Sequence, residues 1–291
     1  MTHKQWLEHA QNQLVKRGMC TQEAAQAVRF LLMHATGWSW EKVLLKDASF
    51  LPPTIEQSLE RMLLLMIEQH MPLAYVLGTV PFLDLAILVR PPVLIPRPET
   101  EWWCAQLCEH IAKVQGDKPF VLIDMCTGSG CIGLAVAQRF VHATVYGVDI
   151  SPQACDLARE NAKKNGIDNF VVVQSDLFAS LELPAHSVDF VVANPPYIPR
   201  DMWASLDGEV RCFEDRAALI AGAQGLDCIE RIVDQAHTFL VMDSLVGLWL
   251  LWIEVDESHV QLVVQHALNL GYAQAEIVHD QYGKNRVVRI R

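Results

Sequence analysis

The segment "NPPY" (194–197) follows directly after the apolar run "VDFVVA" (188–193). Asn194 carries one acceptor oxygen and an NH2 group with two donors. Pro195 and Pro196 fix φ and remove two backbone N–H groups, so their carbonyls remain as acceptors. Tyr197 adds an aromatic face. Because the Asn194 oxygen and the Pro195 carbonyl can each accept one N–H, the segment predicts a site that grips a planar amide or amino-heteroaryl nitrogen and directs its lone pair.

A glycine-rich loop, "DMCTGSG" (124–130), separates a predicted strand from a predicted helix. The strand ends in Asp124, and Gly128 and Gly130 let the backbone pass close to a ligand before the helix N-terminus. The letters "GSGCIG" also fit the GxGxxG pattern of dinucleotide-binding loops, with Asp149 sixteen residues after Gly133. The loop alone therefore leaves two cofactor classes open.

Two further carboxylates follow predicted strands, Asp149 in "VYGVDIS" and Asp176 in "QSDLF". A carboxylate at position 149 can accept both hydroxyls of a ribose, which suits NAD and S-adenosylmethionine equally. Asp176 can accept from an adenine amino group, and Leu177 can cover the ring. In an open parallel sheet ligands bind beyond the carboxyl ends of the strands, so these groups are expected at one edge.

The corner at 194–197 decides between the two cofactors. A hydride-transfer enzyme using NAD has no need of a grip on a planar nitrogen, whereas a methyltransferase does. The sequence therefore favours S-adenosylmethionine. The intact corner also argues against a scaffold that binds the cofactor without catalysis. An adenine-N6 methyltransferase acting on nucleic acid would use the same grip, and it stays an alternative.

The elements that must position these residues alternate between strand and helix from about residue 119 onward. This alternation predicts a mostly parallel sheet with helices on both faces. Residues 1–70 have helical periodicity, whereas 72–98 are rich in β-branched residues and proline, typical of a hairpin or extended linker. The apolar run 245–255 is too short to span a bilayer and is expected to be a core strand.

Composition narrows the class of partner. The chain has 291 residues and a net charge of −11, and the whole excess of acid lies in 81–291, which argues against a groove for nucleic acid. Cys104, Cys108 and His110 fall on a helical pattern, so buried cysteines are expected rather than a metal site. Residues 1–18 show no secretory signal, and a reducing, cytoplasmic setting is expected.

The motifs "NPPY" and "DxxTGSG", together with "LIPRPETE" (94–101), resemble the protein-glutamine N5-methyltransferase family, and within it most closely the branch that acts on peptide chain release factors. The resemblance extends to "GTVPFLDLAILVRPP" in the linker and to "YGKNRVV" near the C-terminus. It implies an S-adenosylmethionine-dependent enzyme that methylates the glutamine of the Gly-Gly-Gln motif in class-1 release factors.

The fold implied by this resemblance is α/β, a class I (Rossmann-like) methyltransferase with a mostly parallel, doubly wound sheet and an antiparallel C-terminal strand. Its expected parts are a substrate-docking helical domain (1–71), a β-hairpin linker (72–98) and a methyltransferase domain (99–291). No membrane association and no direct binding of nucleic acid are expected.

The resemblance also assigns roles by position. Cofactor contacts are expected from Asp124, Cys126, Thr127, Gly128, Ser129, Gly130, Asp149, Ile150, Asp176, Leu177 and Asn194. Catalytic and substrate contacts are expected from Asn194, Pro195, Pro196 and Tyr197, and further substrate contacts from Arg97 and Glu99, with Glu101 in the same segment.

One departure bears on the substrate. The family loop usually has Gly where this chain has Cys126, and "DMCTGSGCI" is similar instead to the sister enzyme that methylates a glutamine of a large-subunit ribosomal protein. A ribosomal protein therefore remains an alternative substrate.

Overall fold

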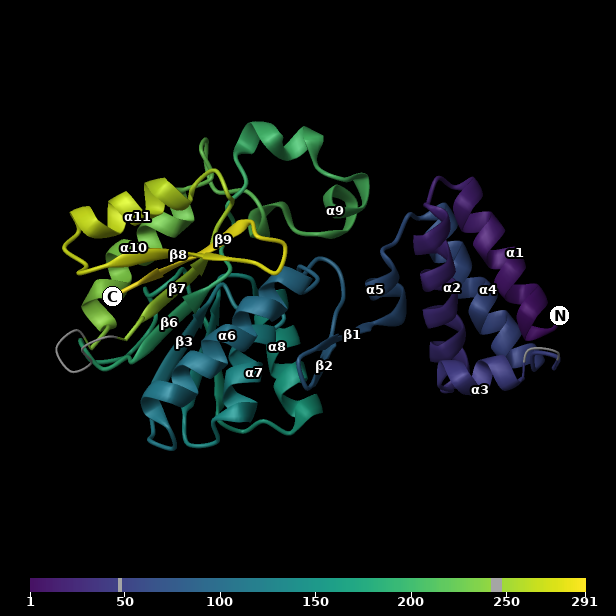
Figure 1. Cartoon of the computed structure of the whole chain (residues 1–291), viewed down its shortest axis with the longest axis horizontal. Helices are drawn as coiled ribbons and strands as arrows, with labels where there is room; N and C mark the ends of the chain where they lie inside the picture. The colour runs from purple at the N-terminus through teal and green to yellow at the C-terminus, as the bar shows by residue number, and fades with distance from the viewer. Residues whose placement is uncertain (47–48, 242–247) are drawn as a thin grey trace. The chain divides into compact units, whose positions relative to one another are not determined.

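The computed structural model describes residues 1–46, 49–241 and 248–291 (Figure 1). The chain divides into two compact units, Met1–Thr79 and Val80–Arg291. Within the described residues, no helix combines the length and apolar character needed to cross a membrane.

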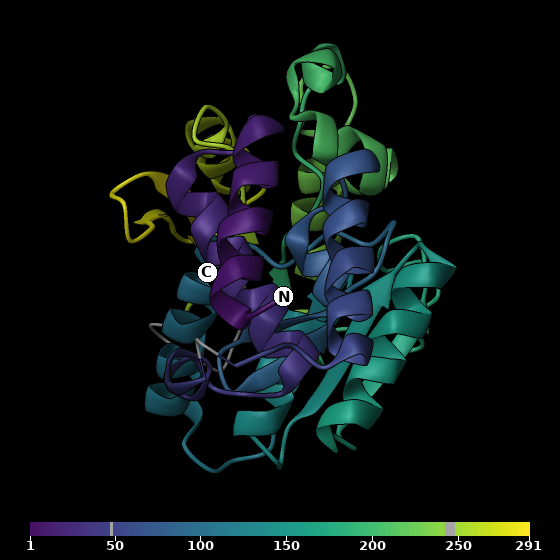
Figure 2. The same cartoon turned by 90° about the vertical axis from the view of Figure 1, so that its right-hand side faces the viewer.

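The first unit is a helical bundle of α1 (His3–Lys16), α2 (Thr21–Thr36), α3 (Trp40–Leu45), α4 (Pro53–Glu68) and α5 (Leu73–Leu77). Thr2 caps α1 in a reciprocal pair with Gln5, and Gly37 ends α2 in the left-handed conformation. The helices α1, α2 and α4 lie side by side (Figures 1 and 2). Their apolar stripes meet in a buried core that includes Trp6 and Leu31.

A two-stranded sheet follows, built from β1 (Thr79–Phe82) and β2 (Leu85–Leu88). Asn161, buried on α8, joins β2 to that helix within the second unit. It accepts from the Leu88 N–H at 2.6 Å and donates to the Leu88 carbonyl at 3.1 Å. The backbone of β2 is thereby paired along its outer edge.

The second unit contains a seven-stranded sheet in the order β5-β4-β3-β6-β7-β9-β8. Strands β3 to β7 are parallel, and β9 is antiparallel to β7 and to β8. The bounds are β3 (Val121–Met125), β4 (Thr144–Asp149), β5 (Phe170–Gln174), β6 (Phe190–Ala193), β7 (Leu251–Glu254), β8 (Ala275–His279) and β9 (Asn285–Ile290). The expectation of a mostly parallel sheet with an antiparallel strand at the C-terminus is confirmed.

Helices cover both faces of this sheet (Figure 1). One face carries α6 (Pro98–Gln115), α7 (Cys131–Arg139) and α8 (Pro152–Asn165), and the other carries α10 (Asp227–Phe239) and α11 (Val260–Asn269). The shorter α9 (Gly208–Phe213) and the 3-10 turns η1 (Arg200–Ser205) and η2 (Arg216–Ala218) lie in the long connection after β6. Because β3 and β6 are covered on both faces, every residue in them is apolar except Asp124 of β3.

Local signals in the sequence set several boundaries. Ser151 caps α8 before Pro152, and Gly166 ends that helix in the left-handed conformation. The buried strand expected within 245–255 is confirmed at Leu251–Glu254, all of it buried, while 245–247 lie outside the described residues. Cys104 and Cys108 are buried on α6, as expected.

Candidate functional site

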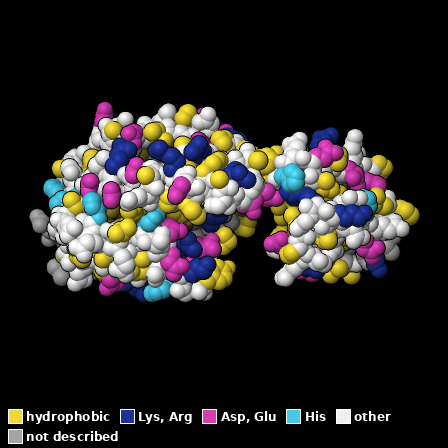
Figure 3. Space-filling view, turned by 90° about the horizontal axis from the view of Figure 1, so that it is seen from above, with side chains coloured by type: hydrophobic (Ala, Val, Ile, Leu, Met, Phe, Trp, Pro, Cys, Tyr) yellow, Lys and Arg dark blue, Asp and Glu magenta, His cyan; other side chains and the backbone are white. Residues whose placement is uncertain are grey.

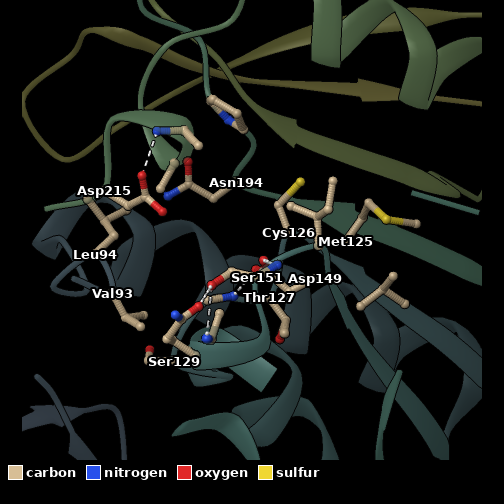
Figure 4. Close-up of a pocket in the computed structure, with 18 of the residues that line it drawn as sticks. Val93, Leu94, Met125, Cys126, Thr127, Ser129, Asp149, Ser151, Asn194 and Asp215 are labelled. Atoms are coloured by element: carbon tan, nitrogen blue, oxygen red, sulfur yellow. Dashed lines mark hydrogen bonds between the residues drawn. The ribbon is translucent and has the colours of Figure 1, made fainter. Parts of the chain in front are cut away.

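A cavity of about 440 Å³ is lined by residues that end or follow β3, β4, β5 and β6. Most of the residues expected to form the site meet there. These are Cys126, Thr127, Gly128, Ser129, Asp149, Ile150, Asp176, Leu177, Asn194 and Pro196. Asn194 lies on one side of the cavity, and Thr127, Ser129 and Asp149 lie on the other (Figure 4).

Asp124 does not line this cavity, although it belongs to the expected cofactor set. Its side chain is fully buried, and Oδ2 accepts from Oγ1 of Thr127 at 2.6 Å and from the N–H of Gly133 at 2.9 Å. Burial raises the pKa of Asp124 to about 7. A Cβ at Gly133 would lie 2.5 Å from the Phe170 ring, so only glycine lets α7 approach the sheet this closely. Asp124 therefore fixes the conformation of the glycine loop through hydrogen bonds on the side of the loop away from the cavity.

Asp149 connects the glycine loop to the start of α8. Its Oδ2 accepts from the N–H of Gly128 at 2.9 Å, and its Oδ1 accepts from the N–H of Ser151 at 2.9 Å. Burial raises the pKa of Asp149 above its usual value, while these backbone donors oppose the shift. Each carboxylate oxygen keeps a second lone pair, which is what two ribose hydroxyls require.

The wall beside Asp149 combines apolar surface from Ile150 and Leu177 with polar groups, among them Asp176. Leu177 is 5% exposed with φ of 50°, and Ile150 is 62% exposed at the rim. Asp176 pairs with Arg231 of α10 at 3.0 Å, a contact that the sequence did not predict.

The hydrogen bond with the Cys228 thiol and burial raise the pKa of Cys126, so this loop residue is a neutral thiol.

The polar corner at 194–197 follows β6. Nδ2 of Asn194 donates to Oγ1 of Thr100 at 3.2 Å, so the acceptor oxygen is the part of its carboxamide left for the cavity. Pro195 is buried, and neither it nor Tyr197 is among the residues that line the cavity. Burial raises the pKa of Tyr197, so its hydroxyl stays protonated.

The segment "LIPRPETE" approaches the cavity through its backbone and apolar side chains, with Leu94 and Pro96 in the lining. Arg97 donates to both carboxylate oxygens of Glu214 at 2.7 Å, while the N–H of Asp215 donates to the Pro92 carbonyl at 2.8 Å. These bonds attach the connection after α9 to this segment.

Other members of the expected sets lie off the lining. Glu99 is part of the first turn of α6, and Glu101 accepts from the N–H of Leu83 at 2.7 Å in the turn between β1 and β2. Gly130 begins α7 with φ of 83°. Arg97, Glu99 and Gly130 are therefore near the cavity but do not form its surface.

Among the lining residues that sequence reasoning missed are four with polar or charged side chains, Thr100, Asp215, Cys228 and Arg231. Thr100 lies inside the quoted segment "PRPETE", and a small hydroxyl residue in the first turn of a helix was a usable signal. Asp215 lies in "GEVRCFEDRAAL" (208–219), a segment that also resembles the family. Cys228 and Arg231 follow a long connection, and nothing in their local sequence marks them.

Comparison with known proteins agrees with this geometry. Residues 5–78 match the model of the PrmC N-terminal domain, and residues 105–204 match that of the methyltransferase small domain. The release factor glutamine methyltransferase of Deinococcus radiodurans is 33% identical over 98% of this chain and 96% of its own. That of Thermodesulfovibrio yellowstonii is 32% identical over 81% of this chain and 80% of its own.

The chain belongs to the release factor glutamine methyltransferase family. A solved structure, the hMettl16 catalytic domain in complex with MAT2A 3'UTR hairpin 6, is 15% identical with a TM-score of 0.51 and covers 81% of this chain and 80% of that one. That likeness concerns the fold alone. The family resemblance and the class I methyltransferase fold are thus both confirmed.

The cofactor of this methyltransferase is S-adenosylmethionine, and the cavity fits it. Its volume lies within the range of small-molecule sites. Carboxylates at Asp149 and Asp176 offer acceptors for ribose and adenine, and Leu177 supplies an apolar face. Among the described residues, the only Lys or Arg in the lining is Arg231, which pairs with Asp176, so the surroundings suit a sulfonium cation.

Proposed function

We propose that this enzyme transfers the methyl group of S-adenosylmethionine to the side-chain nitrogen of the glutamine in the Gly-Gly-Gln motif of class-1 peptide release factors, and so tunes translation termination. One observation carries the proposal. The carboxamide of Asn194 lines the cofactor cavity with its nitrogen engaged by Thr100, which leaves an acceptor for an incoming N–H.

The chemistry required of the chain is mainly positioning. Bound S-adenosylmethionine supplies a methyl group already activated by its sulfonium sulfur. The Asn194 oxygen and the Pro195 carbonyl each accept one N–H of the glutamine amide, which directs its lone pair toward the cavity. Proximity and orientation of this kind supply on the order of 7–11 kcal/mol of a barrier.

These acceptors also act on the electronic state of the nitrogen. Its lone pair is delocalised in the amide, and positive charge develops on it as the new bond forms. Both acceptors become stronger partners at that stage, so they favour the transition state over the bound substrate. A proton then leaves the nitrogen for water or a nearby acceptor, which completes the transfer.

Further substrate contacts are assigned by the same proposal. Tyr197 packs beside the glutamine, and the segment with Arg97 and Glu99 contacts the glycines of the motif. The helical unit Met1–Thr79 docks the body of the release factor.

The relatives' names favour a release factor, whereas the loop sequence around Cys126 is similar to the ribosomal-protein branch. Nucleic acid is the third substrate class. On one face of the C-terminal unit, basic and acidic side chains are interspersed (Figure 3). A phosphate backbone on this face would meet acidic as well as basic side chains, which weakens its binding.

The test is incubation of the enzyme with labelled S-adenosylmethionine and a purified class-1 release factor, with the modified residue mapped by mass spectrometry. The matched control is the same release factor with its Gly-Gly-Gln glutamine replaced by alanine. Label on that glutamine alone supports the proposal. Label only on a parallel ribosomal-protein or nucleic-acid sample overturns it.

A further inference from the structure

The Asn194 carboxamide is held by hydrogen bonds that lead away from the cavity into the core. Its Nδ2 donates to Oγ1 of Thr100 at 3.2 Å, and the Thr100 hydroxyl donates to Oε2 of Glu254 at 2.7 Å. Thr100 and Glu254 are each 2% exposed. They come from the first turn of α6 and the end of β7, so two separate elements meet behind the corner.

Burial raises the pKa of Glu254, whereas the hydrogen bonds from Thr100 and Trp103 lower it. With Glu254 ionised, the chemistry of these groups fixes the direction of every bond. The indole N–H of Trp103 can only donate, and it reaches the same Oε2 of Glu254 at 2.7 Å, so this oxygen is an acceptor. The Thr100 proton is therefore committed to Glu254. Only the lone pairs of the hydroxyl remain toward Asn194, and they can meet an NH2 group but not a carbonyl oxygen.

We propose that Thr100 and Glu254 are positioning residues that determine which end of the Asn194 carboxamide faces the substrate. The inference rests on the proposed function, because it concerns the grip on the glutamine amide. With the carboxamide reversed, its NH2 would face the N–H groups of the glutamine. Two donors would then meet, and only the Pro195 carbonyl would remain as an acceptor that strengthens as charge develops on the nitrogen.

The central pair of variants is Thr100→Val, which keeps the shape and removes the hydroxyl, and Thr100→Ser, which keeps the hydroxyl. Thr100→Val is expected to lower kcat about 10- to 100-fold, as small misplacements at a reacting group do. The KM for the protein and the Kd for S-adenosylmethionine stay near the wild-type values, and Thr100→Ser restores most of kcat. Equal kcat for wild type and Thr100→Val overturns the inference.

Trp103→Phe is the control for a merely structural effect. Trp103 donates to the same carboxylate oxygen but makes no hydrogen bond to Asn194 in the part of the chain that the structure describes. This variant is expected to lower the Tm at least as much as Thr100→Val while lowering kcat far less. If kcat falls in both variants in proportion to the Tm, the role of Thr100 is structural and the inference fails.

A measurement without the protein substrate separates this inference from the proposed function. Side-chain amide protons of Asn194, observed by NMR in the enzyme with S-adenosylhomocysteine, are expected to exchange slowly in wild type and rapidly in Thr100→Val. Equally rapid exchange in both overturns the positioning role even where wild type methylates the release factor. Slow exchange lost in Thr100→Val supports it even where the release factor proves the wrong substrate.

Discussion

The two sides of the cavity are built from contacts of very different range along the chain. The cofactor wall, formed by 126–129 and 149–151, is held by local bonds. Thr127 and Asp124 are 3 positions apart, Ser151 and Asp149 are 2 apart, and Gly128 and Asp149 are 21 apart. These bonds join the end of β3 to its own loop, that loop to the end of β4, and the end of β4 to the start of α8. One βαβ unit therefore contains nearly the whole wall.

The substrate wall, formed by 92–100, 194–197 and 214–215, is held by bonds between distant segments. Asn194 and Thr100 are 94 positions apart, Thr100 and Glu254 are 154 apart, and Arg97 and Glu214 are 117 apart. This wall exists only once the complete second unit has folded. We therefore expect mutations in the two walls to separate cofactor binding from methyl transfer.

The largest effect is expected at the substrate wall. Asn194→Ala removes the acceptor for the glutamine N–H, and kcat should fall about 10³-fold, by analogy with the loss of a group that stabilises developing charge. The Kd for S-adenosylmethionine should hardly change. Turnover of labelled cofactor measures kcat, and calorimetric titration measures the Kd for S-adenosylmethionine. Normal turnover in this variant would contradict the proposed grip.

At the cofactor wall, Asp149→Ala should weaken the binding of S-adenosylmethionine while leaving methyl transfer at saturating cofactor nearly intact. Loss of hydrogen bonds to a charged acceptor corresponds to an increase of about 10- to 100-fold in the Kd for S-adenosylmethionine. At saturating cofactor, kcat should recover most of its wild-type value. Asp156→Ala is the control, because that carboxylate is 68% exposed and pairs only with Arg159 among the described residues. Calorimetric titration measures the Kd for S-adenosylmethionine in both variants. An unchanged Kd in Asp149→Ala would contradict the role of Asp149 in cofactor binding.

Asp124 gives the cofactor wall a pH dependence. The folded pKa of about 7 lies above the ordinary value of 3.8 for an aspartate. The unfolded chain therefore loses this proton before the folded one does, and wild-type stability falls between these two values as pH rises. Relative to Asp124→Asn, wild type should lose about 2–3 kcal/mol of unfolding free energy between pH 5 and pH 7. Urea denaturation of wild type and Asp124→Asn at both pH values measures this loss. A difference in unfolding free energy between the two proteins that does not change with pH would refute the raised pKa.

The smallest effect is expected at the rim of the substrate wall. Arg97→Met leaves the Glu214 carboxylate, whose side chain is 2% exposed, without its partner, and should cost about 2 kcal/mol of stability. Because 214–215 then loosen, the KM for the protein should rise while the Kd for the cofactor stays constant. Arg90→Met breaks an exposed pair with Glu160 and should lower the stability far less. Equal losses in the two variants would show that the buried pair has no special role.

The contrast between the walls also explains what could be predicted from the sequence. The strand ends, the glycine loop and the cap of α8 follow from short patterns, and Asp149 was expected to lie next to that loop because parallel strands share one binding edge. The polar corner was identifiable for the same reason, since a strand that stops at Asn-Pro-Pro has few structural explanations.

The partners of that corner could not be predicted. Local sequence gives no sign that Glu254 ends a strand directly behind Thr100, because strand order depends on packing of the whole sheet. Asp124 shows the opposite error. Its position at a strand end indicated a ligand contact, yet its carboxylate turns toward Thr127 and Gly133 and lies outside the cavity lining. Side-chain direction at a strand end is decided by tertiary neighbours.

The most direct measurement is a crystal structure of the enzyme with S-adenosylhomocysteine and a release factor, or its Gly-Gly-Gln domain. We predict that the glutamine nitrogen lies within hydrogen-bond distance of the Asn194 oxygen and the Pro195 carbonyl, with the Asn194 NH2 on Thr100. A glutamine bound elsewhere, or an Asn194 carboxamide turned away from the cavity, would contradict the account.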